Sequence, residues 1–182
     1  MKFLIASDLH GSAHFTRLLL ERFRKEQADR LLLLGDLLYH GPRNALPEEY
    51  DPALVAAMLN EYKDVILAVK GNCDSSVDQM VLEFPIEAPY LPVFQGGTSL
   101  YLTHGDVFTP EKPMPMPRGS AFLFGHIHVP VNEWRGGILF LNPGSVSIPK
   151  GESTNGYMVF EKGVFTFKKI DGTPYDKAVL RA

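Results

Sequence analysis

FLIASDLHG, residues 3–11, is an apolar run that breaks directly into an aspartate and a histidine. Its first four residues are apolar without alternation, which is typical of a strand buried on both faces. Two similar blocks follow along the chain, LLLLGD at 31–36 and VILAVKGNCD at 65–74. The three blocks predict core strands that carry polar side chains at their ends.

The segments between these strands have helical patterns. After Ser12, a suitable N-cap, apolar residues recur close to helical spacing at 15, 18, 19 and 23. A second helix is expected from Asp51-Pro52, an N-cap followed by proline in the first turn. A strand, helix, strand, helix, strand order predicts parallel strands joined by right-handed crossovers.

The second half of the chain has the pattern of hairpins. Glycine-containing turns are expected at 95–98, 135–138 and 162–163, and further core strands at 100–102 and 121–124. The stretch 105–119 has four prolines and no apolar periodicity, so it is expected to be a long loop, functional or mobile. From residue 171 onward we expect a short strand or a loose tail.

These patterns predict an α/β fold, a four-layer αββα sandwich with two mixed β-sheets flanked by helices. A chain of 182 residues is long enough for one domain with a substantial core and short for two. A single domain is therefore expected over residues 1–182.

Composition argues against several classes of function. A formal net charge of -3 and a pI near 6.1 disfavour a nucleic-acid-coating surface, which needs a basic excess. The apolar start stops at Asp8, well short of a secretory signal, and no run approaches the ~18 apolar residues of a membrane span. One cysteine excludes an internal disulfide and fits a reducing compartment. The expectation is a cytoplasmic protein without membrane or nucleic-acid partners.

Residues that can bind metals recur where the predicted strands end. They are Asp8, His10, Asp36, Asn72, His104, His126 and His128. In open α/β sheets, binding sites form outside the carboxyl ends of strands. Hard oxygen donors mixed with imidazole suit a hydrolytic centre with two divalent metals. Each motif alone also fits a turn, a helix cap or a surface strand, but their joint occurrence in this order favours one metal site.

The chain resembles the calcineurin-like metallophosphoesterase superfamily over residues 1–150. The resemblance rests on Asp8-x-His10, Gly35-Asp36, Gly71-Asn72-x-Asp74, His104-Gly105 and Gly125-His126-x-His128. The small size, the segments 40–44 and 142–145, and Cys73 resemble the bacterial YfcE-type phosphodiesterases in particular.

This resemblance implies a ligand set for each of two divalent metal ions. One ion would be held by Asp8, His10, Asp36 and His128. The second would be held by Asn72, His104 and His126, with Asp36 bridging to it. Manganese is the usual activating ion that the resemblance implies, with iron, zinc or nickel as alternatives.

The implied activity is that of a metal-dependent phosphodiesterase in which a metal-bridging hydroxide attacks the phosphorus of a small phosphate ester. Two divalent cations, two carboxylates and one hydroxide leave a single positive charge, enough to bind an anionic ester. A phosphomonoesterase with the same centre is the nearest alternative. A non-catalytic scaffold, like the retromer subunit of this fold, is a more distant one.

Cys73 departs from the superfamily pattern, in which most members have histidine. That histidine, paired with the aspartate that here is Asp74, is taken to stabilise the transition state or to protonate the leaving group. A thiol is a poor hydrogen-bond donor and carries no positive charge. Esters with good leaving groups should therefore be favoured, unless another group takes the place of the histidine. The alternative is that Cys73 has no catalytic role and is a small neutral residue in the wall of the site.

Arg43, in the loop after the second strand, is a candidate phosphate contact, because guanidinium binds oxyanions bidentately. A solvated arginine is the alternative. The predicted catalytic residues are Asp36, Arg43, Asn72, Cys73 and Asp74. His14, His40, Asn142 and Ser145 are weaker candidates. Trp134 and Phe140 are expected to serve in packing or in a subunit interface, which leaves a homo-oligomer open.

Overall fold

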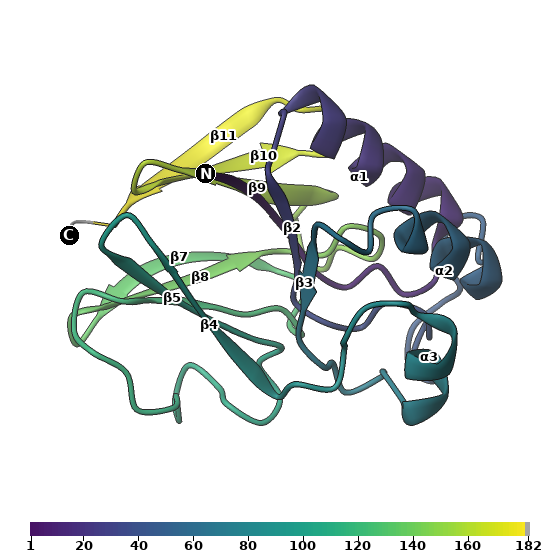
Figure 1. Ribbon diagram of the computed structural model, residues 1–182, viewed down its shortest axis with the longest axis horizontal. Helices are drawn as coiled ribbons and strands as arrows, with labels where there is room; N and C mark the ends of the chain where they lie inside the picture. Colours follow the sequence, from purple (N-terminus) through teal and green to yellow (C-terminus); the bar gives the residue numbers. More distant parts are fainter. Residues whose placement is uncertain (181–182) are drawn as a thin grey trace.

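The first sheet is built around the opening apolar run. The computed structural model describes residues 1–180 and is shown in Figure 1. The run forms β1 (Lys2–Ala6), which pairs in parallel with β2 (Arg30–Leu33), and β2 pairs in parallel with β3 (Ile66–Ala68). The predicted parallel unit is therefore confirmed.

Two helices connect these strands, as the capping signals predicted. In α1 (Ala13–Lys25), Ser12 accepts a hydrogen bond from the Phe15 amide at 3.3 Å. In α2 (Pro52–Asn60), Asp51 accepts from the Leu54 amide at 3.0 Å. A third helix, α3 (Ser76–Val81), was not predicted, although Ser75 and Asp78 form a capping box at its start.

The chain returns to the first sheet at its end. Three antiparallel strands complete that sheet, namely β9 (Gly156–Glu161), β10 (Val164–Lys169) and β11 (Pro174–Val179). The sheet order is β11-β10-β9-β1-β2-β3. Of the expected strand or loose tail after residue 171, the part at 174–179 is a strand. Residues 181–182 of the predicted domain lie outside the described residues.

The second sheet has the order β4-β5-β6-β8-β7. Its strands are β4 (Tyr90–Gln95), β5 (Thr98–Thr103), β6 (Ala121–Leu123), β7 (Pro130–Arg135) and β8 (Ile138–Pro143). Hairpins join β4 to β5 and β7 to β8, whereas β5, β6 and β8 run parallel. Each of the three predicted glycine turns therefore connects the two strands of a hairpin, since the third joins β9 to β10.

Alternate residues of β1 contribute to two cores. Leu4 packs toward α1 and α2, whereas Phe3 and Ile5 face the second sheet, so both faces of the strand are buried as predicted. The helices α1 and α2 cover the outer face of the first sheet (Figure 1). The predicted α/β class, with two mixed sheets flanked by helices, is confirmed.

The outer face of the second sheet has a different cover. Phe122, Phe124 and Phe140 pack there against Met114 and Phe108 of the segment 105–119. Met114 is 5% exposed, so the long loop is a packed part of the fold. Among residues 1–180, no helix combines the length and the apolar character needed to cross a membrane.

Candidate metal centre

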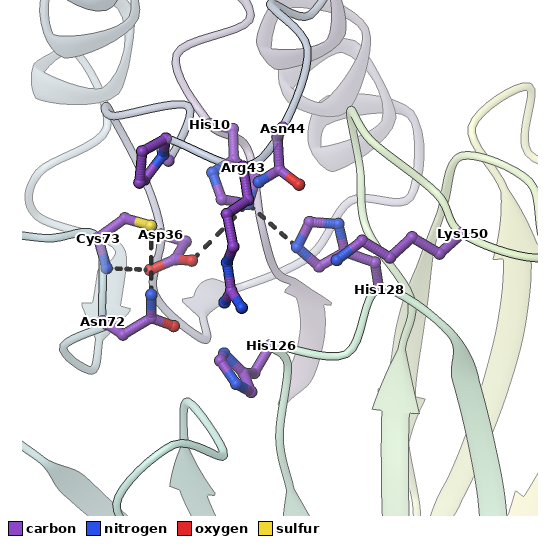
Figure 2. Close-up of a pocket in the computed structure, with 11 residues that line it drawn as sticks. His10, Asp36, Arg43, Asn44, Asn72, Cys73, His126, His128 and Lys150 are labelled. Carbon is purple, nitrogen blue, oxygen red and sulfur yellow. Dashed lines mark hydrogen bonds and ion pairs between the residues drawn. The ribbon is translucent and has the colours of Figure 1, made fainter.

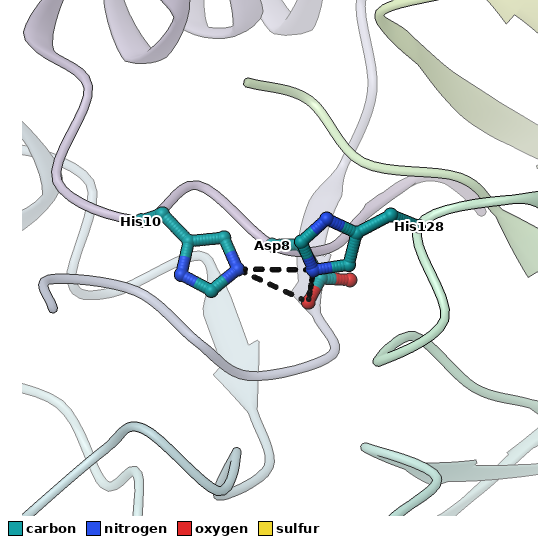
Figure 3. Close-up of side chains that lie close together, drawn as sticks. All are labelled: Asp8, His10 and His128. Atoms are coloured by element: carbon teal, nitrogen blue, oxygen red, sulfur yellow. Dashed lines mark hydrogen bonds and ion pairs between the residues drawn. The ribbon is translucent and has the colours of Figure 1, made fainter. Parts of the chain in front are cut away.

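Donors from both sheets converge at the carboxyl ends of the parallel strands. Asp8 and His10 follow β1, and His128 follows β6. Their donor atoms lie within 4.8 Å of one another. Asp8 Oδ1 is 3.2 Å from His128 Nε2 and 3.6 Å from His10 Nε2, and Figure 3 shows the carboxylate beside both rings. These three residues form the first donor cluster.

The imidazoles of this cluster are oriented by the backbone. His10 Nδ1 donates to the Tyr39 carbonyl at 2.8 Å, and His128 Nδ1 donates to the Ile148 carbonyl at 2.7 Å. Because a carbonyl can only accept, Nδ1 carries the proton, and in the neutral ring the lone pair lies on Nε2. The two Nε2 atoms face each other at 3.1 Å. Such lone pairs repel unless a proton or a cation lies between them.

One carboxylate oxygen in this cluster lacks a hydrogen-bond partner. Asp8 is completely buried, and its Oδ1 makes no hydrogen bond to any described residue. An unpaired buried carboxylate oxygen is costly, and it is a feature of metal ligands. Two imidazole nitrogens and this oxygen match the donors that divalent transition ions accept. The first cluster therefore fits a metal ion.

A second donor cluster lies beside the first. His104 Nδ1 donates to the Leu34 carbonyl at 2.7 Å, and its Nε2 is 3.0 Å from the Asn72 amide oxygen. The ring of His126 stands edge-on to that of His104, with centroids 5.1 Å apart. Asn72, His104 and His126 thus meet from β3, β5 and β6, as the resemblance implied.

Asp36 lies between the two clusters. Its Oδ2 is 3.7 Å from His10 Nε2 and 3.4 Å from His104 Nε2. Its Oδ1 instead accepts the Cys73 amide at 2.8 Å. One oxygen is therefore fixed by the backbone, while the other faces donors of both clusters.

The backbone at these donors is strained. Asp8, His10, Asp36, His126 and His128 all have positive φ, between 48° and 68°. Non-glycine residues rarely adopt this left-handed conformation, and it persists where surrounding contacts enforce it. Five of the seven predicted ligands are held in this way, which indicates that the turns are shaped for the side chains they present.

The negative charge of Asp8 and Asp36 dominates the site. Burial works against ionisation of both carboxyls. His10, His128 and His104 nevertheless hold the pKa of Asp8 below its usual range, and His104 with the Cys73 amide does the same for Asp36. Burial likewise opposes charging of His104, yet the hydrogen bond and charge of Asp36, with Asp8, raise the pKa of His104 to about 10. Despite burial, the pKa of His10 is raised as well, chiefly by Asp8, and carboxylates that favour a charged imidazole also favour a bound cation.

The end of β8 and the segment that follows it donate hydrogen bonds to the backbone of the ligand turns. Ser145 and Ser147 both donate to the Asp8 carbonyl, at 2.8 and 3.0 Å. Asn142 donates to the Gly125 carbonyl at 2.7 Å. Asn142 and Ser145, weak site candidates from the sequence, therefore support the ligands without lining the pocket. Ser147, which the sequence analysis missed, carries no local motif that would have revealed its role.

Asp74 is buried away from the pocket surface. It accepts the amides of Asp36 and Leu37 at 2.8 Å each and that of Gly71 at 2.7 Å. Burial, together with the charge of Asp36, raises the pKa of Asp74 despite these donors. The carboxylate predicted to be catalytic thus orients the turn that carries Asp36, so we propose that it is a positioning residue.

Replacing Asp74 with asparagine is expected to lower the free energy of unfolding by about 2–4 kcal/mol, because an amide NH₂ would face backbone donors. Urea unfolding measures this change. The control is Asp78→Asn, which alters only the exposed α3 capping box and should cost about 1 kcal/mol. Equal losses in the two variants would contradict this role for Asp74.

The donors open into one pocket of about 290 Å³. Besides five of the ligands, the residues that line it include Cys73, Arg43, Asn44 and Lys150 (Figure 2). Burial and the charge of Asp36 raise the pKa of the Cys73 thiol to about 12. Arg43 reaches across the pocket in Figure 2. Lys150 was missed by the sequence analysis because nothing in its local sequence sets it apart.

The remaining candidates lie elsewhere. His14 lies on α1, and its Nδ1 is 3.6 Å from Glu48 Oε1. The ring of His40 packs edge-on against Tyr39 and Tyr50. Phe140 is buried in the outer core, whereas Trp134 is 47% exposed on β7. The subunit interface at Trp134 stays a prediction.

Comparison with known proteins agrees with the family resemblance of the sequence. Residues 1–163 match the family model of the calcineurin-like phosphoesterase superfamily domain. The chain is 49% identical over 166 residues to phosphodiesterase YfcE of Escherichia coli strain K12, covering 91% of this chain and 90% of that protein. The structure of E. coli YfcE, a phosphoesterase, matches with a TM-score of 0.97 at 45% identity, covering 100% of both chains. Vps29 of Entamoeba histolytica in complex with Zn²⁺ matches at a TM-score of 0.63 and 19% identity over 100% of both chains, which indicates a shared fold alone.

Proposed function

The chain belongs to the calcineurin-like phosphoesterase superfamily and is a metal-dependent phosphoesterase, and we propose that it hydrolyses phosphate diesters at a centre of two divalent ions. The name of its relative, a phosphodiesterase at 49% identity, supports the diester as substrate. Residues 1–182 would act as one domain, in the cytoplasm.

The observation that carries the dinuclear proposal is the position of Asp36. Its Oδ2 faces His10 at 3.7 Å and His104 at 3.4 Å, so one carboxylate oxygen can serve two neighbouring ions. Asp8, His10 and His128 would complete one set of ligands, and Asn72, His104 and His126 the other. Manganese is the ion we expect, with iron, zinc or nickel as alternatives.

Two bound ions would supply acidity to a shared water molecule, making it a hydroxide nucleophile, and positive charge to the phosphate group. The chain's own residues then have two tasks. The backbone carbonyls of Tyr39, Ile148 and Leu34 keep the imidazole lone pairs directed into the site. Arg43 can donate to the non-bridging oxygens of the ester, where negative charge grows in the transition state.

The leaving group would meet a weaker donor. Cys73 lines the pocket where a neutral thiol offers little help to a departing alkoxide. Esters whose leaving groups need no proton, such as nitrophenyl diesters, should therefore react best.

The test is turnover of bis(p-nitrophenyl) phosphate and of p-nitrophenyl phosphate with Mn²⁺, followed by a screen of phosphate-ester metabolites. Faster turnover of the diester supports the proposal. Faster turnover of the monoester would make the protein a phosphomonoesterase. A protein that retains no metal by elemental analysis, and hydrolyses neither ester with any divalent ion, would instead be a scaffold.

Replacing Cys73 with histidine is expected to raise kcat/KM for diesters with alkyl leaving groups about tenfold relative to nitrophenyl diesters, because imidazole can protonate a poor leaving group. The measurement is the ratio of the two rates. Cys73→Ser serves as the control, since a hydroxyl adds no comparable acid. If the histidine variant keeps the wild-type ratio, a leaving-group role for position 73 is wrong.

A further inference from the structure

Two basic side chains line the pocket without an acidic partner. Among the described residues, neither Arg43 nor Lys150 makes a side-chain hydrogen bond or an ion pair. Asp36 is the one acidic residue found among the described residues that line the pocket. In a chain with a formal net charge of -3, the walls outside the donor clusters are thus positive.

Lys150 is held next to a metal-ligand candidate by its backbone. Its amide donates to the His128 carbonyl at 3.2 Å, and two residues earlier Ile148 accepts from His128 Nδ1 at 2.7 Å. Ser153 Oγ donates to the carbonyls of His128 and Lys150 and so closes this turn. The backbone of Lys150 is therefore fixed, while its flexible side chain can place the ammonium group over a range of positions.

The two basic residues enter the pocket from different places. In Figure 2 the Arg43 side chain runs between Asp36 and His128, and its guanidinium group lies above His126 in this view. Lys150 enters beside His128, on the side away from Cys73 (Figure 2). A diester phosphate carries a single negative charge, which the donor clusters and Arg43 can meet without Lys150.

We propose that Lys150 binds a second anionic group of the substrate, so that the preferred ester is a phosphate diester whose non-leaving arm carries a carboxylate or a phosphate. This inference rests on the proposed function for its substrate class. An ammonium in a pocket that is partly open to water favours such an arm about five- to tenfold over a neutral one.

The test compares substrates that differ only in the arm, 2-carboxyethyl and 2-carbamoylethyl p-nitrophenyl phosphate. Wild-type protein should have a KM about five- to tenfold lower for the carboxylate. In Lys150→Met the ratio of the two KM values should fall to about one, and in Lys150→Glu it should invert. If Lys150 instead neutralised the reacting phosphate, the variants would change both KM values equally, and the inference would be overturned.

Two control variants locate the effect. Arg43→Met should weaken turnover of both substrates but keep their ratio, because its contact is with the shared phosphate. Lys177→Met, on the exposed strand β11, should change neither substrate. Loss of the ratio in Arg43→Met but not in Lys150→Met would assign the anionic arm to Arg43 and overturn the role of Lys150.

A binding measurement separates this inference from the proposed function. Calorimetry with Mn²⁺-loaded protein should show 3-phosphonopropanoate binding about five- to tenfold more tightly than its amide, and this difference should disappear in Lys150→Met. Propane-1,3-bisphosphonate tests a phosphate as the second anion in the same way. Absent turnover with a preserved binding difference would refute the diesterase alone, whereas equal binding of acid and amide would refute the second-anion site whatever the turnover.

Discussion

Asp36→Asn is expected to lower kcat/KM for a nitrophenyl diester at least about 10³-fold, a loss of about 4 kcal/mol in transition-state stabilisation. The physical reason is the placement of Oδ2 between the two donor clusters, 3.7 Å from His10 Nε2 and 3.4 Å from His104 Nε2. An asparagine has a similar shape but no charge, and half of its head group is an NH₂ that cannot bind a cation. Both metal positions should therefore weaken together.

The measurement is metal content per chain after dialysis, taken beside the turnover rate. Asp64→Asn, an exposed aspartate between α2 and β3, is the matched control and should change neither quantity. Asn72→Ala provides a second comparison, because it removes a donor of one cluster and should reduce occupancy at one position. If Asp36→Asn loses one metal and retains the other at full occupancy, Asp36 does not serve both.

Gly71→Ala is expected to lower turnover about 10²-fold although it removes no ligand. A Cβ on Gly71 would overlap the backbone nitrogen and the carboxylate oxygen Oδ1 of Asp36. Those atoms belong to a turn that Asp74 also holds, so the strain should move Asp36 rather than a free side chain. Displacements of about 1 Å at a catalytic group cost about this much in rate.

The control is Gly96→Ala, in the β4–β5 turn, where an added Cβ has no neighbour within 4 Å. Gly96 has a φ of 56°, so alanine there carries backbone strain without a clash. Gly71→Ala should therefore lose metal affinity and turnover, while Gly96→Ala should lose only stability, by about 1 kcal/mol. Equal turnover in the two variants would show that the Gly71 contact does not position Asp36.

Much of the candidate site could be predicted because its residues follow strands. Polar residues directly after an apolar run mark the carboxyl end of a strand, and parallel strands align these ends at one edge of a sheet. Asp8, Asp36 and Asn72 could therefore be grouped before their distances were known. His104 and His126 could be added because each also follows a strand-like apolar run, and the structure shows that these two strands run parallel.

The elements that escaped prediction lack such local marks. Helix α3 has six residues and no buried side chain, so it shows no apolar periodicity. The segment 105–119 covers the second sheet through Met114 and Phe108, which show no apolar periodicity. Asp74 has the same sequence context whether it faces substrate or backbone, and its three accepted amides decide between these roles.

The sequence by itself predicted the α/β class, the alternation of strands and helices in the first seventy residues and the candidate donors, because apolar periodicity and residue chemistry are local properties. The tertiary structure alone decided that Asp36 lies between two clusters, that Ser147 supports Asp8 and that Lys150 reaches the pocket. These relations join residues far apart in the chain, such as Asp8 and Ser147 with a separation of 139. Contacts of this range depend on how the two sheets pack, which no local pattern encodes.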